Sequence, residues 1–200
     1  MREAKMKVLG RATSGNVQKV LFLLEELKAD YSREDYGRQF GNTAGKDYLA
    51  MNPTGKVPTL CDGDVILWES NTILRYIANK AQSSLYPTEL AQRAQIEIWM
   101  DWLLASLNGP YVSIFKATKS GEEVPQAAAK EVAAGLSLLD GQLSKASCLA
   151  GENFSLADVC LGPIVHRCIN FPVDLPELPN LQRWYSAIKE RPAFQTAISG

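Results

Sequence analysis

The sequence is poor in the side chains that hold metal ions. Among its 200 residues there is one histidine, and the four cysteines include no pair with the CxxC spacing. Protein sites for zinc and related metals need clustered Cys, His or carboxylate ligands at short spacings. We therefore expect no metal site and no metal cofactor.

An excess of charge and a long apolar run are also missing. The 21 basic and 22 acidic residues give a formal net charge of −1, and no basic block stands out. Such a chain has no overall field that would attract nucleic acid or an anionic membrane. No apolar run approaches the ~18 residues of a membrane span, and no secretory signal peptide is recognisable. We expect a cytoplasmic protein without nucleic-acid or membrane partners.

The most informative feature that is present is a proline-containing turn followed by a short strand. It runs from Asn52 to Leu60, in the order Asn-Pro-Thr-Gly-Lys-Val-Pro-Thr-Leu. Pro58 stands between the turn and the strand, and X-Pro bonds are the only peptide bonds that become cis at modest cost. We expect the Val57–Pro58 bond to be cis. The N–H and C=O of Val57 would then point outward, where an extended peptide can pair with them as an added strand.

A helix start follows this strand after a hairpin. The sequence Trp68-Glu69-Ser70-Asn71 places the first helical turn near Glu69 and Ser70. The free N–H groups and the positive end of a helix dipole favour a carboxylate ligand at such a point. Ser70 offers a hydroxyl donor, and Glu69 offers a partner for an ammonium group. A small acidic peptide with a free amino-acid end would satisfy both.

These residues together resemble the glutathione-binding part of the glutathione transferases, and the resemblance extends over the whole chain. In that family a cis-proline strand and a Glu/Ser pair in a thioredoxin-like domain hold glutathione. The resemblance implies that glutathione is the co-substrate and that it is bound by Val57, Pro58, Glu69 and Ser70. It also implies that Lys56 pairs with the glycyl carboxylate of glutathione. Gln39, with Arg38 beside it, is a candidate for the same end of the ligand.

The chemistry of this family needs a glutathione thiolate at neutral pH. A free thiol has a pKa near ~8.5, which falls when hydrogen-bond donors or positive dipoles face the sulfur. The resemblance places that donor in the turn between the first strand and the first helix. There Ser14 matches the catalytic hydroxyl of the serine-type classes, and Asn16 matches the amide of an asparagine-type bacterial group, so the chain resembles the theta- or nu-like members of the family. Either side chain can donate to a sulfur anion, and the sequence does not choose between them.

Two other donor types are missing from that turn. It has no tyrosine, which is the donor in several classes of the family, and no cysteine. The lack of cysteine argues against the mixed-disulfide mechanism of the cysteine-type classes.

The order of the expected elements divides the chain in two. Short strands near 6–10, 31–36, 59–61 and 65–68 alternate with helices, in the order βαβ, a short helix, then ββα. The βαβ unit implies parallel strands, and the hairpin adds an antiparallel pair. The expected fold class is α/β plus all-α. A thioredoxin-like domain with a mixed four-stranded sheet spans 1–81, and an all-helical domain spans 88–200.

Long periodic helices dominate the second half. The first is expected from Thr88 to Phe115, with a kink at Gly109-Pro110. Ser155 and Asp158 form a variant of the capping box at the start of a later helix. The family resemblance places the electrophile pocket between the two domains, over the long helix, although aromatic side chains at helical spacing are more often core residues. The candidates for this pocket are Trp102, Leu103, Asn108, Tyr111 and Phe115.

The resemblance implies an enzyme that conjugates the glutathione thiolate with small electrophiles, in the manner of detoxification enzymes. It also implies a homodimer, because the family consists mostly of two-fold dimers. Two alternatives stay open. One is a glutathione-dependent disulfide or peroxide reductase on the same scaffold, and the other is a non-catalytic binding module, since a fold does not fix a function.

Overall fold

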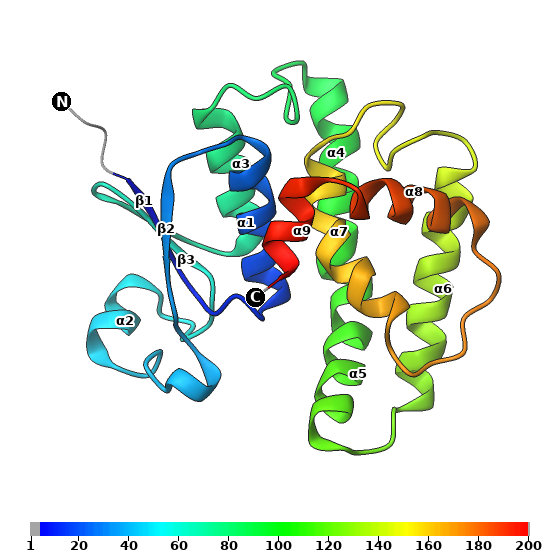
Figure 1. Cartoon of the computed structure of the whole chain (residues 1–200), viewed down its shortest axis with the longest axis horizontal. Coiled ribbons are helices and arrows are strands. Elements are labelled where there is room, and N and C mark those ends of the chain that lie inside the picture. The colour runs from blue at the N-terminus through cyan, green and yellow to red at the C-terminus, as the bar shows by residue number, and fades with distance from the viewer. Residues whose placement is uncertain (1–4, 200) are drawn as a thin grey trace. The chain divides into compact units, whose positions relative to one another are not determined.

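The computed structural model describes residues 5–199, which form two compact units (Figure 1). The first unit comprises the chain up to Ser83 together with the segment from Arg191 onward. The second unit comprises Ser84–Glu190. These boundaries differ from the expected domains, 1–81 and 88–200, chiefly because the last helix belongs to the first unit.

A four-stranded mixed sheet forms the first unit, as expected. Its strands, in the spatial order β2-β1-β3-β4, are β1 (Met6–Leu9), β2 (Tyr31–Glu34), β3 (Thr59–Asp62) and β4 (Val65–Trp68). β1 runs parallel to β2, and β3 is antiparallel to both β1 and β4. A parallel pair needs a crossover connection, and the first helix supplies it.

Helices connect and cover these strands. α1 (Gly15–Glu26) returns the chain from β1 to β2, and α3 (Ser70–Lys80) follows β4. A 3-10 turn (Arg38–Phe40) and the short α2 (Lys46–Met51) lie between β2 and β3. Burying one large apolar side chain contributes about 1.5–3 kcal/mol. The core residues of this unit include Val8, Val17, Val20, Leu24, Leu60, Ile73 and Leu74.

The last helix, α9 (Pro192–Ile198), packs against α1 (Figure 1). Phe194 is fully buried and meets Phe22 edge-on, with the ring centroids 5.2 Å apart. At the start of the segment, Arg191 binds the carboxylate of Glu26 in bidentate fashion, with N–O distances of 2.6 and 2.7 Å. A segment from the far end of the chain therefore completes the first unit.

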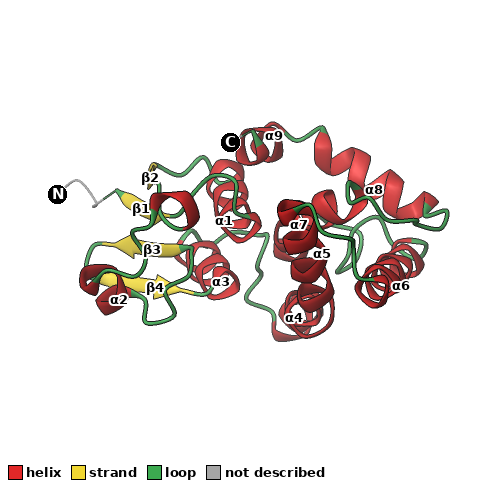
Figure 2. Ribbon diagram, turned by 90° about the horizontal axis from the view of Figure 1, so that it is seen from below, coloured by secondary structure: helices red, strands yellow, loops and turns green. Residues whose placement is uncertain are grey.

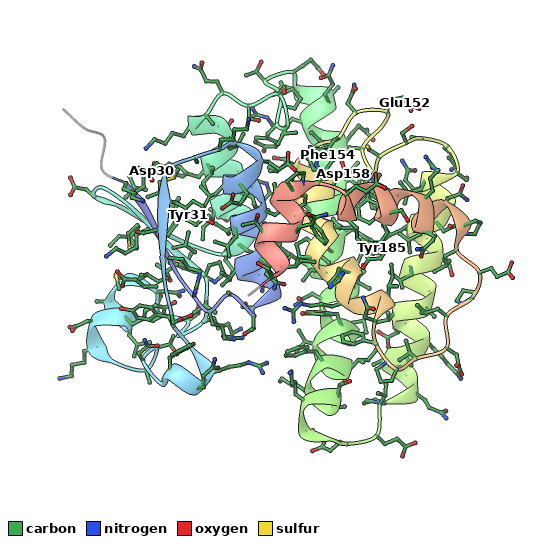
Figure 3. The ribbon with its side chains drawn as sticks, in the orientation of Figure 1. Asp30, Tyr31, Glu152, Phe154, Asp158 and Tyr185 are labelled. Atoms are coloured by element: carbon green, nitrogen blue, oxygen red, sulfur yellow. The ribbon has the colours of Figure 1, made fainter. Side chains whose placement is uncertain are left out.

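The second unit is all helical (Figure 2). Its elements are α4 (Leu90–Trp102), a π-helical segment (Leu103–Leu107), α5 (Asn108–Ser120), α6 (Gln126–Leu143), α7 (Leu156–Ile169) and α8 (Pro179–Lys189). α7 is almost wholly buried and contacts both α4 and α8. The expected capping box at its start is confirmed, with Ser155 and Asp158 in the reciprocal arrangement. The Asp158 carboxylate (Figure 3) also accepts a hydrogen bond from the indole of Trp184 at 2.8 Å.

The long helix is interrupted one turn before the expected kink. Proline lacks an N–H group, and its ring clashes with the carbonyl four residues earlier in an α-helix. For Pro110 that carbonyl belongs to Ser106, which lies in the π-helical segment. The wider π turn accommodates the proline, so Gly109 and Pro110 lie inside the first turn of α5.

None of the helices within residues 5–199 is long and apolar enough to cross a lipid bilayer. In the same part of the chain, no three His, Cys, Asp or Glu side chains are grouped so as to hold a metal ion.

Candidate active site

The turn between β1 and α1 presents Ser14 at the start of a helix. The N–H of Ser14 donates to the C=O of Arg11 at 3.1 Å, and its C=O accepts from the N–H of Gln18 at 2.8 Å. Its side chain is buried, with the residue 8% exposed, and makes no capping hydrogen bond to its own helix. The first turn of α1 has no acidic residue, so no side-chain charge there offsets the positive helix end. The hydroxyl therefore lies where an anion is favoured.

The Val57–Pro58 peptide bond is cis, as expected. We call residues 52–58 the cis-proline loop. Among residues 5–199, no backbone–backbone hydrogen bond uses the N–H or the C=O of Val57. The ladder between β1 and β3 begins only at Thr59. Val57 thus has two main-chain groups that the sheet leaves unused.

Two residues that sequence reasoning missed hold the cis-proline loop in place. Asn52, which is 1% exposed, donates through Nδ2 to the C=O of Lys56 at 2.9 Å and to the hydroxyl of Thr59 at 3.0 Å. Its Oδ1 accepts from the N–H of Thr54 at 3.1 Å. The hydroxyl of Tyr48 donates to the same Lys56 carbonyl at 2.5 Å, and burial raises the pKa of Tyr48, so the donor keeps its proton. The sequence did contain one indication of this role, the Asn52-Pro53 pair. An Asn side chain often accepts a hydrogen bond from the backbone N–H two residues later in a turn, as Asn52 does from Thr54.

Gly10 lets the cis-proline loop lie against the turn that carries Ser14. A Cβ atom on Gly10 would stand 2.5 Å from Cγ2 of Val17 and 3.3 Å from Cβ of Val57. The first distance is too short for any side chain, so the packing of Val17 on α1 against Gly10 requires glycine, and the second shows that the cis-proline loop also lies close to the same residue. Gly37, whose φ is +85°, faces the same Val57 side chain, with its Cβ position 3.4 Å from Cγ1.

A hydrogen bond between two candidate residues joins the starts of α1 and α3. The hydroxyl of Ser70, a residue that is 4% exposed, donates to Oδ1 of Asn16 at 3.3 Å. Glu69 precedes it as the N-cap of α3, with φ +70° and an exposed side chain. Such a backbone conformation is uncommon for a residue other than glycine and is concentrated at functional sites. The structure therefore brings Asn16, Glu69 and Ser70 together.

The other two residues that are candidates for binding the ligand, Lys56 and Gln39, have exposed side chains. Lys56 has its main-chain carbonyl fixed by Asn52 and Tyr48, whereas its side chain extends from the cis-proline loop. Gln39 lies in the 3-10 turn Arg38–Phe40 and is exposed as well. No hydrogen bond between either side chain and the other candidate residues is present among residues 5–199.

In the second unit the candidate residues for the electrophile do not form a single group. Tyr111 stacks with Phe115 on α5, with the ring centroids 6.1 Å apart. Trp102 instead meets Trp99 edge-on at 5.8 Å, and its ring is 3.6 Å from the Cβ position of Gly135 on α6. Trp102 therefore packs towards α6. Asn108 begins α5 and is partly exposed, and Leu103 is a core residue with 1% exposure.

Two residues that the sequence did not single out join Tyr111 and Phe115. Phe171 stacks with Tyr111 at 5.8 Å, and Cζ of Arg167 lies 5.5 Å from the ring centroid of Phe115. Both come from the end of α7 and the loop that follows. No local pattern in the sequence connects that segment with α5, so only the packing of the helices reveals the contact.

Comparison with known families decides the identity of this fold. Residues 4–79 match the family described as "Glutathione S-transferase, N-terminal domain". Residues 100–192 match "Glutathione S-transferase, C-terminal domain". The chain belongs to the glutathione S-transferase family. The resemblance seen in the cis-proline loop and the Glu69-Ser70 pair is thereby confirmed for the whole chain.

Individual glutathione S-transferases match over nearly their full length. Glutathione S-transferase GstB of Escherichia coli is 40% identical over 94% of this chain and 95% of the relative. Glutathione S-transferase 4 of Zea mays is 30% identical over 96% and 92%. The crystal structure of a theta class glutathione S-transferase from Xanthomonas axonopodis pv. citri, with glutathione bound, superposes with a TM-score of 0.93. It shares 34% identity over 98% of this chain and 97% of that one.

Proposed function

We propose that this glutathione S-transferase holds the glutathione thiolate with the hydroxyl of Ser14, with Asn16 as its partner or substitute. The enzyme conjugates glutathione, its co-substrate, with small electrophiles. The observation that carries the proposal for Ser14 is that its side chain makes no capping bond at a helix start. Asn16 accepts a hydrogen bond from Ser70 through its amide oxygen, which leaves its two N–H groups as the alternative donor.

The reaction needs only ionisation and attack. The thiol of glutathione loses its proton to solvent, and the resulting thiolate attacks the electrophilic carbon. With an aryl halide, a carbon–sulfur bond forms and a carbon–halogen bond breaks, and the halide leaves with the bonding electron pair. The Ser14 hydroxyl and the N-terminal end of α1 stabilise the thiolate, which lowers the thiol pKa below its ordinary value.

The remaining groups of glutathione have partners around this point. The N–H and C=O of Val57, beside Pro58, pair with the peptide backbone of the ligand as an added strand. The amino-acid end is bound by Ser70 and Glu69, through its carboxylate and its ammonium respectively. Lys56 and Gln39 bind the glycyl carboxylate. Support for this assignment comes from the unused backbone groups of Val57 and from the exposed side chains of the last two residues.

The helical unit supplies the surface for the electrophile. Tyr111 and Phe115 are the stronger candidates, because they stack with each other and with Phe171. Trp102 packs towards Gly135, and Asn108 is partly exposed, so these two residues have weaker support.

The test of the function compares two substrates in the presence of glutathione. We expect turnover of chlorodinitrobenzene, followed as the growth of thioether absorbance, and much slower reduction of a small disulfide. Faster reduction of the disulfide would favour the reductase alternative. Failure to bind immobilised glutathione would leave only a non-catalytic module.

We also propose that the enzyme is a homodimer. β4 is at the edge of the sheet, where Val65, Ile66 and Trp68 are 40%, 44% and 38% exposed. An exposed apolar edge strand favours association unless it is covered. Light scattering should report about 44 kDa, twice the 22.0 kDa of the chain. A mass of one chain at micromolar concentration would contradict the proposal.

A cytoplasmic role in detoxification fits the chemistry. All four cysteines are free thiols, and Cys61 and Cys148 are partly exposed. Exposed thiols persist in a reducing compartment. Fractionation of the cells that make the protein tests the location, and appearance in a secreted fraction would contradict it.

A further inference from the structure

Buried hydrogen bonds in the first unit converge on the main-chain carbonyl of Lys56. Tyr48 lies on α2, and Asn52 directly follows that helix (Figure 1). Tyr48, Asn52 and Thr59 are 2%, 1% and 0% exposed. The carbonyl of Lys56 accepts from the hydroxyl of Tyr48 at 2.5 Å and from Nδ2 of Asn52 at 2.9 Å. We call the three side chains the buried network.

The polar hydrogens of the buried network can all be assigned. Tyr48 gives its single hydroxyl hydrogen to Lys56, so Thr59 is the donor in the 2.9 Å bond between Thr59 and Tyr48. Asn52 has two amide hydrogens, one on the carbonyl of Lys56 and the other on the hydroxyl of Thr59 at 3.0 Å. One donor would already satisfy a carbonyl group. The second donor restricts the rotation of the peptide group.

The carbonyl of Lys56 and the N–H of Val57 belong to the same peptide group. Among residues 5–199 the single cis bond is Val57–Pro58, so the bond between Lys56 and Val57 is trans. In a trans peptide the C=O and the N–H lie in one plane and point in opposite directions. Two donors hold the carbonyl from one side, and the N–H of Val57, which the sheet leaves unused, is therefore held in the opposite direction.

The same bonds also change the strength of that N–H as a donor. Hydrogen bonds in a chain polarise one another, and the effect is larger in the low dielectric of a protein interior. Two donors on the carbonyl of Lys56 withdraw electron density from its peptide group, which makes the N–H of Val57 more positive. The buried network thus affects both the direction and the strength of a donor that it does not touch.

We propose that Tyr48 and Asn52 are positioning residues for glutathione, which aim the N–H of Val57 at the peptide backbone of the ligand through the carbonyl of Lys56. This inference rests on the proposed function, because it requires Val57 to pair with the ligand backbone. Both side chains are buried, so they act through the peptide group and do not touch the ligand. The network should therefore control the affinity for glutathione and leave the ionisation of its thiol unchanged.

The first experiment removes one hydroxyl from the network and keeps the ring. Tyr48→Phe should raise the KM for glutathione and the Kd for S-methylglutathione roughly threefold to tenfold, the effect of weakening one neutral hydrogen bond. S-methylglutathione has no thiol, so it reports the backbone contacts alone. The kcat at saturating glutathione and the thiol pKa should not change. Tyr36→Phe is the matched control without effect, because it removes a hydroxyl from the ring stacked on Tyr48 at 5.1 Å.

A second variant separates positioning from stability. Thr59→Val removes a fully buried hydroxyl but leaves both donors on the carbonyl of Lys56. Its melting midpoint should fall, because an N–H of Asn52 loses its partner, while its Kd for S-methylglutathione should stay close to that of the wild type. If affinity only followed stability, Thr59→Val would weaken binding as much as Tyr48→Phe does. That result would overturn the inference.

The amide signal of Val57 gives a direct readout in protein labelled with ¹⁵N-valine. Saturating S-methylglutathione should shift this signal in the wild type, and the shift should be smaller in Tyr48→Phe. Equal shifts and equal affinities in the two proteins overturn the inference, while turnover by the wild type leaves the proposed function standing. A wild type that neither binds S-methylglutathione nor turns over glutathione overturns both. If Tyr48→Phe does not fold, Asn52→Ala removes the other donor and is judged by the same comparison.

Discussion

Ser14 occupies the N-cap of α1 without capping it. A serine at this position ordinarily accepts a hydrogen bond from the second or third N–H of its helix, which stabilises the helix by about 1 kcal/mol. The backbone of Ser14 has the extended conformation of a cap, with φ −87° and ψ 123°, yet its oxygen is not used in that way. Ser155, at the start of α7, is used as a cap. Within one chain, therefore, the serine at the start of α7 caps its helix through its side chain, whereas the serine at the start of α1 does not.

The thiol pKa is the property that Ser14 should control. Ser14→Ala should raise the pKa of bound glutathione by about one unit or more, because a hydrogen bond to a charged group contributes about 1.5–3 kcal/mol and 1.36 kcal/mol corresponds to one unit. Turnover at neutral pH should fall, since a raised pKa leaves less thiolate there, while glutathione affinity should persist. Thiolate absorbance against pH measures the effect, with Asn16→Ala as the alternative donor and Thr13→Ala as the control in the same turn. Unchanged titrations in both the Ser14 and Asn16 variants would refute the mechanism.

At this scale the sequence identifies residues whose role is local and misses those whose role depends on packing. The cis bond before Pro58 and the capping box of Ser155 depend on neighbours in the chain, and both were predicted. Tyr48 acts through a carbonyl in a loop that follows its helix, and Arg167 acts against a ring on another helix. Nothing in the sequence near Arg167 reports that contact.

At the scale of elements, one buried carboxylate connects the sheet with a helix. Asp62, at the end of β3, accepts hydrogen bonds from Lys80 at 2.6 Å and from Tyr76 at 2.8 Å, both on α3. Burial alone would raise the pKa of Asp62, but the bonds from Lys80 and Tyr76 outweigh it and hold the pKa below its usual value. The order of strands and helices was readable from periodicity. The contact of Asp62 with α3 was not predicted, because it depends on how the end of strand β3 and the end of helix α3 pack against each other.

The lowered pKa of Asp62 makes part of the stability depend on pH. An acid whose pKa is lowered on folding contributes stability above its unfolded pKa, near ~3.9, and loses it as pH falls through the folded value. Urea unfolding at a series of pH values below about 4 should therefore show a falling free energy of unfolding in the wild type. The Asp62→Asn variant should have a lower free energy of unfolding than the wild type at neutral pH. Its free energy of unfolding should also decrease less steeply over the same acidic range. Asp64→Asn, which changes the exposed carboxylate of the same hairpin, should keep the slope of the wild type.

At the scale of the whole molecule, the first unit is built from two separate segments of the chain. The strands and α1 to α3 come from the first part of the chain, and α9 returns from beyond the helical unit to cover α1. The sequence pattern placed the segment of α9 in the all-helical domain that was expected over 88–200. It did not show that α9 leaves the helical unit, because the apolar face of an amphipathic helix fits either core.

The contact between α9 and α1 should carry a measurable part of the stability. Phe194→Ala removes a fully buried ring that meets Phe22, and such substitutions cost about 3–5 kcal/mol. Thermal melting should show a large fall in the midpoint for Phe194→Ala and little change for Thr196→Ala, an exposed position on the same helix. A midpoint for Phe194→Ala close to that of the wild type would show that α9 contributes little to the unit.

Because α9 belongs to the first unit, its position in the chain also determines the order in which the two units can finish folding during synthesis. Domains generally fold as units while the chain is being made. Residues 191–198 are translated only after the whole of 84–190, so the helical unit can fold completely while the sheet still lacks its final helix. During that interval Phe22 and its neighbours on α1 are open to solvent and to chaperones. The sheet unit would therefore be completed last, although most of its residues are synthesised first.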